Sequence, residues 1–264
     1  MDHSQSIFVE DSTWAEVEAF LKAQCKNAIA VWGWGATEQH GPRMIEGTDT
    51  LIADHFMRVI ADNRPVIVFP TMPIGMSRHH EAFAGTMSLS AEAATSVACC
   101  VLRSIYRTGI RKLFALMGHG GNVAPFNGAI TSLGKEIAGL KITEHLDGLF
   151  YETEGELGDL INNHFGEKPS HAGALEASVL YAILDQMKLG SEVSRLMNIP
   201  FTDGMVTPGI HGQGTQGSDP IAFQRMFPTG SKGDQRKADL DFGIRILDLM
   251  SDRLLAYFDE FSKS

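Results

Sequence analysis

Cysteine, basic residues and long apolar runs are scarce in this chain of 264 residues. The three cysteines (Cys25, Cys99 and Cys100) are odd in number and show no C-x-x-C spacing. We therefore expect free, mostly buried thiols in a reducing compartment, and no disulfide framework. No apolar run approaches the roughly 18 residues of a membrane-spanning helix. The first residues also lack the basic start of a secretory signal, so none is expected.

Basic residues are outnumbered by acidic ones. The chain has 22 Lys and Arg against 32 Asp and Glu, which gives a formal net charge of −10. This charge argues against nucleic acid or an anionic membrane as the main partner. The apolar fraction of 44% and the charged fraction of 20% are ordinary for a soluble globular protein, and we expect a cytoplasmic one.

Apolar runs typical of strands alternate along the chain with segments of helical periodicity. The expected strands are residues 28–32, 65–70, 87–89, 112–117 and 140–146. The expected helices are residues 14–21, 50–60, 90–107, 157–164 and 171–187, one helix after residue 122, and a last helix with an apolar face of Leu240, Ile244, Leu247, Leu254 and Phe258. This alternation predicts βαβ units and a mostly parallel sheet covered on both faces. We therefore expect one α/β domain over residues 1–264, with a long irregular stretch at about 200–233.

Two polar clusters come directly after expected strands. Glu38 and His40 follow the first strand two residues apart, so in extended backbone both side chains point to the same side while Gln39 faces away. Asp49 follows at the start of the next helix, and His119 follows the 112–117 strand between glycines. In open α/β sheets ligands bind beyond the carboxyl ends of strands, so a metal site of carboxylates and imidazoles is predicted there.

A plain structural interpretation exists for each cluster. E-x-H is a short and common pattern, and its polar residues can be solvated on a glycine-rich loop. Glycine-flanked histidines such as His119 also occur as ordinary turn residues. Two such clusters in one α/β chain favour a functional site more than either does alone.

Four motifs occur together in one order: T-E-Q-H-G-P…G-T-D (37–49), S-x-x-H-x-x-F-x-G-T (77–86), G-H-G-G-N (118–122) and H-A-G-x-x-E-x-S (171–178). This set resembles the creatininase (creatinine amidohydrolase) family over about residues 8 to 185. The resemblance implies a three-layer α/β/α sandwich that holds two divalent metal ions, with zinc favoured and manganese or iron as alternatives. It also implies a homo-oligomer, with a hexamer favoured, in which the 200–233 stretch packs against a neighbouring subunit.

The resemblance also assigns roles to single residues. The metal ligands would be Glu38, His40, Asp49 and His119, with Asp49 bridging both ions. His171 would be the acid/base residue that gives a proton to the leaving nitrogen, with a packing histidine at a helix start as the alternative. Glu176 would be either its partner or a general base. The substrate pocket would include His80, Arg78 and Gly120, although His80 and Arg78 are also compatible with a solvated loop.

The chain departs from creatininase proper beside the metal. Gly120 and Gly121 stand where creatininase has an aromatic residue and a carboxylate that binds the second metal ion. The tryptophans that close over creatinine have no counterpart, because Trp14, Trp32 and Trp34 all lie in or before the first motif. We therefore expect a wider and less negative pocket, a more weakly held second ion, and a larger or anionic amide as the substrate.

The leading functional hypothesis is a divalent-metal amidohydrolase acting on a small non-peptide C–N bond in a lactam, cyclic amide or formamide. Creatinine hydrolysis itself, or hydrolysis of a lactone or C–C bond on the same metal site, is the alternative within the enzyme class. A metal-binding or small-molecule-binding protein without turnover is the alternative outside it. Metal content and a screen of cyclic amides and formamides separate these hypotheses.

Overall fold

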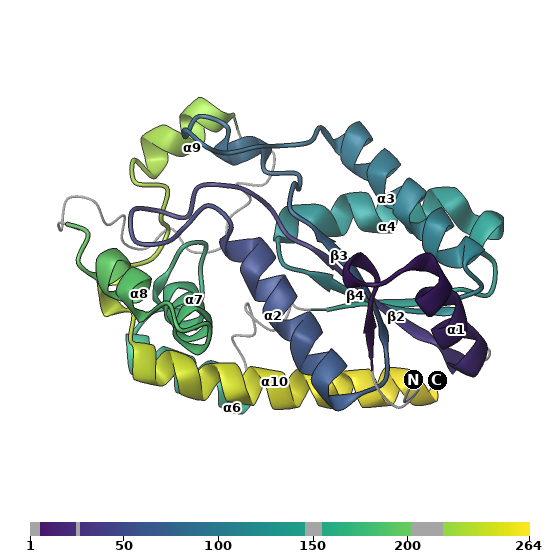
Figure 1. Ribbon diagram of the computed structural model, residues 1–264. Helices are drawn as coiled ribbons and strands as arrows, with labels where there is room; N and C mark the ends of the chain where they lie inside the picture. Colours follow the sequence, from purple (N-terminus) through teal and green to yellow (C-terminus); the bar gives the residue numbers. More distant parts are fainter. Residues whose placement is uncertain (1–5, 25–26, 146–154, 202–218) are drawn as a thin grey trace.

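The computed structural model describes residues 6–24, 27–145, 155–201 and 219–264, and Figure 1 shows a sheet between two groups of helices. The strands are β1 (Ile7–Phe8), β2 (Ile29–Trp34), β3 (Ile67–Met72), β4 (Lys112–Met117) and β5 (Lys141–His145). They lie in the order β1-β3-β2-β4-β5, and each neighbouring pair is parallel. The predicted α/β fold with a parallel sheet is confirmed.

The helices follow the predicted alternation with the strands. Their bounds are α1 (Trp14–Gln24), α2 (Thr48–Asn63), α3 (Ala91–Arg107), α4 (Val123–Leu133), α6 (Gly155–Phe165), α7 (Ala174–Gln186), α8 (Gly190–Met197), α9 (Pro220–Met226) and α10 (Leu240–Lys263). Short 3-10 turns include η3 (Arg78–His80) and η4 (Gly120–Asn122). None of the described helices combines the length and apolar composition that a bilayer-spanning segment requires.

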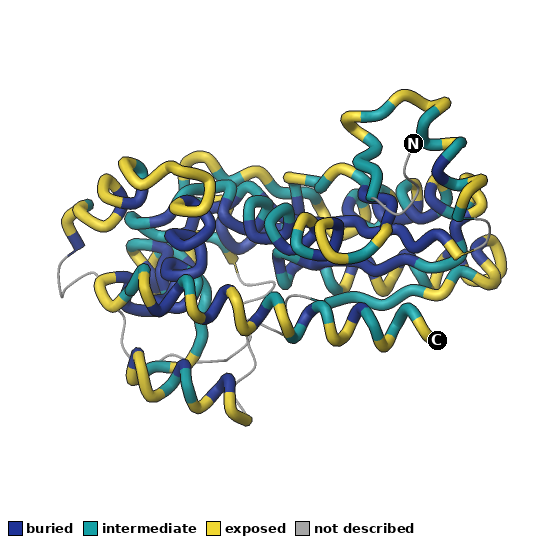
Figure 2. Tube along the Cα trace, turned by 60° about the horizontal axis from the view of Figure 1, so that its bottom comes forward, coloured by how far each residue is buried: buried dark blue, intermediate teal, exposed yellow. Residues whose placement is uncertain are grey.

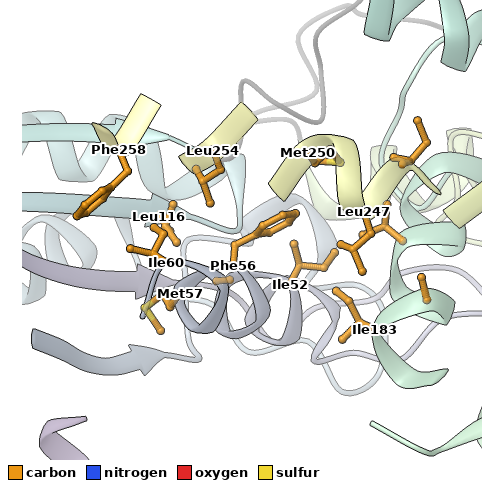
Figure 3. Close-up of a cluster of buried hydrophobic side chains, with 14 of the residues drawn as sticks. Ile52, Phe56, Met57, Ile60, Leu116, Ile183, Leu247, Met250, Leu254 and Phe258 are labelled. Carbon is orange, nitrogen blue, oxygen red and sulfur yellow. The ribbon is translucent and has the colours of Figure 1, made fainter. Parts of the chain in front are cut away.

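Alternate side chains of the central strand enter two separate cores, because successive residues of a strand point to opposite faces. Ile29 and Val31 of β2 pack with α2, α7 and α10 on one face, while Trp32 and Trp34 pack with α1, α3 and α4 on the other. Every residue of β2 is buried, and Figure 2 shows the buried interior of the molecule between helices whose outer sides are exposed. Figure 3 shows Phe56 of α2 in the first core, among α10 side chains such as Leu254.

Local sequence signals account for several helix starts. Thr13 and Glu16 form a reciprocal capping box before α1, with the Thr13 amide donating to Glu16 Oε2 over 2.8 Å. Ser90 caps α3, and Asp239 caps α10 by accepting from the Phe242 amide. The apolar face predicted for the last helix is confirmed in the first core, which also takes Met250 from that helix.

Some local predictions are wrong. The helix expected from His171 begins at Ala174, because Ala172 has a φ of +52°, which a right-handed helix does not allow. The strand expected at 87–89 is reduced to isolated bridges at Met87 and Ser88. The stretch at 200–233 is not irregular throughout, because Asp219 caps α9 and Pro220 occupies its first position. Residues 202–218 of that stretch, and with them half of the segment expected at a subunit boundary, lie outside the described residues.

Three further features were not predicted correctly. β1 and α8 were not foreseen, since β1 is too short to show a period and α8 is a short helix directly after α7. The expectation of mostly buried thiols holds for Cys99, whereas Cys100 is exposed on α3. Cys25 lies outside the described residues.

The connections that follow the neighbouring strands β2 and β4 run to opposite faces of the sheet. The chain leaves β2 for α2 on one face, and it leaves the neighbouring β4 for α4 on the other face. Such a divergence opens a crevice beyond the carboxyl ends of the two strands, and this is where ligands bind in open α/β sheets. The loops with Glu38, His40 and His119 start at these two strand ends.

Candidate metal centre

The structure brings together the four residues predicted as metal ligands. Glu38 and His40 follow β2, His119 follows β4, and Asp49 lies in the first turn of α2. All four are buried, from Glu38 at 0% exposure to His119 at 7%. Four ionisable side chains at this depth require compensation by charge or by hydrogen bonds.

The side chains form two groups that share one carboxylate. His119 Nδ1 lies 3.3 Å from Glu38 Oε1 and 3.2 Å from Asp49 Oδ2. His40 Nε2 lies 3.0 Å from Asp49 Oδ1 and 3.8 Å from Glu176 Oε1. Within each group the ligand atoms lie within 4.8 Å of one another, and the same holds for an alternative group of Glu38, His40 and His171. Asp49 therefore offers one oxygen to each of the two groups that share it.

Main-chain carbonyls fix which ring nitrogen of each ligand histidine faces the centre. His40 Nδ1 lies 3.0 Å from Glu38 O, and His119 Nε2 lies 3.1 Å from Met76 O. A carbonyl oxygen only accepts, so these outer nitrogens carry hydrogens, and in the neutral ring the inner nitrogens then have the lone pairs that a metal ion needs. Metal-binding histidines in proteins are held in this way.

Three of the four oxygens of the buried Glu38 and Asp49 carboxylates lack a hydrogen-bond partner among the described residues. Among the described residues, neither oxygen of Glu38 accepts a hydrogen bond, and the same holds for Asp49 Oδ2. Leaving an ionised carboxylate buried without a partner is strongly unfavourable. Divalent cations at the two groups would bind these oxygens, and the mixed carboxylate and imidazole donors suit Zn²⁺, Mn²⁺ and Fe²⁺. The residues present therefore fit the implied metal ions.

The neighbouring charges of the centre also shift the pKa values of its ligands. Burial favours neutral histidines, yet the carboxylates of Asp49 and Glu176 raise the pKa of His40 well above its usual value. Burial likewise lowers the pKa of His119, but the carboxylates of Glu38 and Asp49 outweigh burial and raise this pKa well above its usual value. Burial would raise the pKa of Asp49, but His40 and His119 lower it to about 2. Without a metal ion, the centre thus attracts protons to its two ligand histidines.

His171 and His80 lie beside Glu38 and have the opposite tendency. His171 Nδ1 is 3.7 Å and His80 Nε2 is 3.5 Å from Glu38 Oε1, and the two rings stack with centroids 4.3 Å apart. Burial, followed by the charges of neighbouring histidines, lowers the pKa of both rings. Both are therefore neutral at physiological pH, which suits His171 to accept a proton first and donate it later.

Glu176 reaches the centre from the first turn of α7. Its Oε2 accepts a hydrogen bond of 2.6 Å from the Ala172 amide, and this holds the carboxylate against the loop that carries His171. Its other oxygen, Oε1, is the atom that faces His40. One oxygen is thus anchored, and the other points to the second ligand group.

The structure gives two of the predicted substrate-binding residues, Arg78 and Gly120, different surroundings. Arg78 is exposed and lines a cavity of about 370 Å³ together with Glu81 and Glu92, so its charge there is opposed by two carboxylates. Gly120 is half-buried at the start of η4, next to His119. The extra width expected at Gly121 is wrong, because a Cβ there would overlap Met76 O and His119 Nε2, which already fill the space.

Sequence reasoning missed Gln39. Its side chain was expected to face away from the metal ligands, and it does so, but it reaches the outer sides of His80 and His171. No pattern of spacing signals this role, because the three residues come from separate loops. The placement of the tryptophans, by contrast, agrees with the sequence. Trp32 and Trp34 are core residues, and Trp14 is 79% exposed on α1.

Family models of known proteins give one match that spans nearly the whole chain. The model described as "Creatininase: Creatinine amidohydrolase" matches residues 10–258. The chain belongs to the creatininase family.

Two curated members and one solved structure of this family illustrate the range of similarity. A mycofactocin precursor peptide peptidase of Mycobacterium ulcerans (strain Agy99) is 30% identical over 227 residues, which are 83% of this chain and 79% of the relative. Creatinine amidohydrolase of Pseudomonas putida is 31% identical over 122 residues, 44% of this chain and 46% of the relative. A structure titled "Creatininase Mn" superimposes with a TM-score of 0.76 at 23% identity, covering 97% of this chain and 99% of that one.

Metal binding by this creatininase-family chain is expected to release protons. The raised pKa values of His40 and His119 stabilise the metal-free fold below the ordinary histidine pKa, and this stabilisation is lost as the pH rises through the raised values. A cation at Nε2 of His40 and Nδ1 of His119 displaces these protons. We expect release of about two protons per chain near pH 7, and tighter binding as the pH rises.

Calorimetric titration of the metal-free protein with Zn²⁺, in two buffers of different ionisation enthalpy, measures this proton release. Zinc binding without any proton release at neutral pH would contradict the arrangement of charges described above.

Proposed function

We propose that this protein is a divalent-metal-dependent hydrolase that cleaves an amide C–N bond. The observation that carries the proposal is the pair of buried ligand groups that share Asp49. Glu38, Asp49 and His119 would hold one ion, and His40, Asp49 and Glu176 the other. Two divalent ions held this way supply a nucleophile at neutral pH and polarise a carbonyl group. Zinc is the expected metal, with manganese or iron as alternatives.

Glu176 takes the place of the carboxylate that this chain lacks at residues 120 and 121. With glycine at both positions, residues 120 and 121 offer no side-chain oxygen to the second ion. Glu176 Oε1 lies on the same side of His40 as Asp49 and needs no rearrangement of the anchored Oε2. We therefore assign Glu176 to the second metal site in preference to the role of general base.

Replacing Glu176 with glutamine is expected to remove the second ion and spare the first. An amide keeps the shape of the side chain but loses the negative charge, and the first group of Glu38, Asp49 and His119 is untouched. Loss of a supporting partner alone typically weakens metal affinity by about 10–100-fold, and loss of a direct ligand should cost at least as much. Elemental analysis after dialysis against a fixed zinc concentration should give about one ion per chain.

Glu192→Gln is the matched control, because Glu192 is exposed on α8 and pairs only with Arg195 among the contacts of the described residues. Two tightly bound ions in Glu176→Gln, as in this control, would show that Glu176 is not a ligand.

His171 and His80 are the side chains that would transfer a proton and bind the substrate next to the reacting bond. The neutral Nδ1 of His171 faces Glu38 and is placed to accept a proton and then deliver it to the leaving nitrogen. His80 Nε2, which has no hydrogen-bond partner among the described residues, faces the same carboxylate. It is placed to bind a substrate oxygen.

Two classes of amide remain as substrates. A non-peptide bond in a cyclic amide, lactam or formamide is the first candidate. A peptide bond is the second, because the Mycobacterium ulcerans relative, which aligns over most of its length, is described as a peptidase. Creatinine itself is expected to be a poor substrate, because Trp32 and Trp34 are committed to the core and leave no tryptophan pair among the described residues to stack on its ring.

The zinc-loaded protein, with metal content verified, should be assayed on lactams, hydantoin-type cyclic amides, N-formyl compounds, creatinine and short peptides. Hydrolysis confined to non-peptide amides supports the first class, and hydrolysis of peptides supports the second. Creatinine turnover with kcat/KM on the order of 10⁴ M⁻¹s⁻¹ or above would contradict the expectation for that substrate. Full metal occupancy without turnover of any amide would contradict the proposed function.

Assembly is part of the same proposal. We propose a homo-oligomer, with a hexamer favoured, on the basis of the family resemblance. Light scattering at micromolar concentration measures it, and a mass near the 28.8 kDa of one chain would contradict it.

A further inference from the structure

Gln39 lies between two proposed metal ligands and binds neither metal group. It is 4% exposed, and its side chain extends from the strand-like segment to the side opposite Glu38 and His40. There its amide nitrogen lies 2.8 Å from His80 Nδ1, 2.9 Å from His171 Nε2 and 3.2 Å from Gly230 O. A single amide thus contacts both histidines that the proposed function places beside the reacting bond.

The orientation of this amide is determined at both ends. Gln39 Oε1 accepts a hydrogen bond of 3.0 Å from the Gly41 amide, which can only donate. Nε2 faces Gly230 O, which can only accept. In a flipped amide, the NH₂ group would face the Gly41 N–H, so that a donor meets a donor. Its oxygen would face Gly230 O, so that an acceptor meets an acceptor. Gly230 has a φ of +83°, and a Cβ there would overlap Gln39 Oε1. Only glycine therefore fits at residue 230 while the Gln39 amide holds this position.

The number of hydrogens on the Gln39 amide then determines which ring nitrogens of His80 and His171 are protonated. The amide has two hydrogens but faces three groups, namely Gly230 O and one nitrogen of each histidine. One ring nitrogen must therefore carry its own hydrogen and donate elsewhere. His171 Nε2 has such an acceptor, the main-chain oxygen of Gln39 at 3.1 Å. The two amide hydrogens then satisfy Gly230 O and His80 Nδ1.

We propose that Gln39 is a positioning residue that fixes the tautomers of His80 and His171 on the side of the metal centre. His171, protonated at Nε2, presents a bare Nδ1 to the site and can accept a proton. His80, accepting at Nδ1, carries its hydrogen on Nε2 and presents a donor to the same space. Both inner atoms face Glu38 Oε1, at 3.7 Å and 3.5 Å. The meaning of this arrangement for catalysis rests on the proposed function, while the tautomers themselves do not.

Nitrogen NMR of the zinc-loaded, histidine-labelled protein tests the proposal without any substrate. Magic-angle-spinning spectra of the sedimented protein distinguish a protonated from a bare ring nitrogen whatever the size of the assembly. His80→Gln and His171→Gln identify the two residues by the signals that disappear. The wild-type protein should show hydrogen on Nε2 and a bare Nδ1 in both rings. A hydrogen on Nδ1 of either ring would overturn the proposal, even if no variant of Gln39 can be purified.

Gln39→Glu tests the cause. A carboxylate of the same shape can only accept, so it should move the hydrogen of His80 to Nδ1. Gln235→Glu is the matched control, since Gln235 is 1% exposed and, within the described part of the chain, its amide bonds the main chain of His40 and Arg43 and no histidine ring. The tautomers should be unchanged in that control. Unchanged tautomers in a zinc-loaded Gln39→Glu protein would overturn the proposal.

Measurements of activity separate the proposed hydrolase function from the positioning role of Gln39. With any amide that the wild type hydrolyses, Gln39→Glu should lower kcat by about 10–100-fold at full zinc content, with little change in KM. Expected tautomers in a protein that hydrolyses nothing would contradict the proposed function and leave the role of Gln39 standing. Turnover together with the wrong tautomers would contradict the role of Gln39 alone.

Discussion

Replacing Asp49 with alanine is expected to leave the protein without tightly bound metal and without hydrolytic activity. Asp49 is the one carboxylate that belongs to both ligand groups, with Oδ1 facing His40 and Oδ2 facing His119. Its loss leaves each group with two ligands, and it removes the charge that offsets the positive ions. The other proposed ligands cannot compensate, because they are held by main-chain contacts and by the packing of separate loops.

Elemental analysis of Asp49→Ala after dialysis measures this outcome, and thermal unfolding with and without added zinc shows whether any site remains. A protein that no longer binds zinc gains no stability from it, since a ligand stabilises only the state that binds it. Asp62→Ala, which changes an exposed aspartate on the same helix, controls for general effects on α2. His119→Ala should lose only the ion of the first group. Two ions in Asp49→Ala would refute the bridging role.

Replacing His171 with asparagine is expected to lower kcat by about 10²–10⁴-fold while the metal content stays at the wild-type level. The ring lies beside the proposed ligands without belonging to either group that shares Asp49. Asparagine retains a polar group near Gln39 but cannot shuttle a proton at neutral pH. Steady-state kinetics on the best amide from the substrate screen, with zinc measured in the same samples, tests this directly.

His164→Asn is the comparison for His171→Asn, because His164 lies on α6, where it pairs with Asp239 and stacks on Phe242, and it belongs to none of the ligand groups. Its kinetics should match the wild type. Loss of an ion in His171→Asn would make the residue a ligand, in line with the alternative grouping of Glu38, His40 and His171. Wild-type kcat in that variant would remove His171 from the mechanism.

The order of strands and helices could be predicted from the sequence because each element carries its own period and boundary signals. The capping box at Thr13, the cap at Ser90 and the proline-bounded run 65–70, which overlaps β3, are local, and they act wherever the rest of the chain lies. The predictions that went wrong depended on contacts that periodicity does not show. The start of α7 was decided locally, because the Glu176 carboxylate accepts from the Ala172 amide four residues earlier and holds it outside the helix. The two-residue β1 was decided by a distant segment, because it exists through its parallel pairing with β3.

The sequence by itself determined which chemistry is possible at the centre. Glu38 and His40 face one side because they are two residues apart on an extended segment, and the loop after β4 brings His119 to the same edge because parallel strands end together. Four motifs in order were sufficient to indicate the family, which the family model then confirmed over residues 10–258. All of this depends on short-range spacing and on the general behaviour of parallel sheets.

Only the tertiary structure decided how these groups are connected. The sharing of Asp49, the approach of Glu176 to His40 and the contacts of Gln39 with two histidines all join loops separated by many residues. Hydrogen bonds and metal coordination depend on positions to within a fraction of an ångström, and periodicity in a sequence specifies only the side to which a residue points.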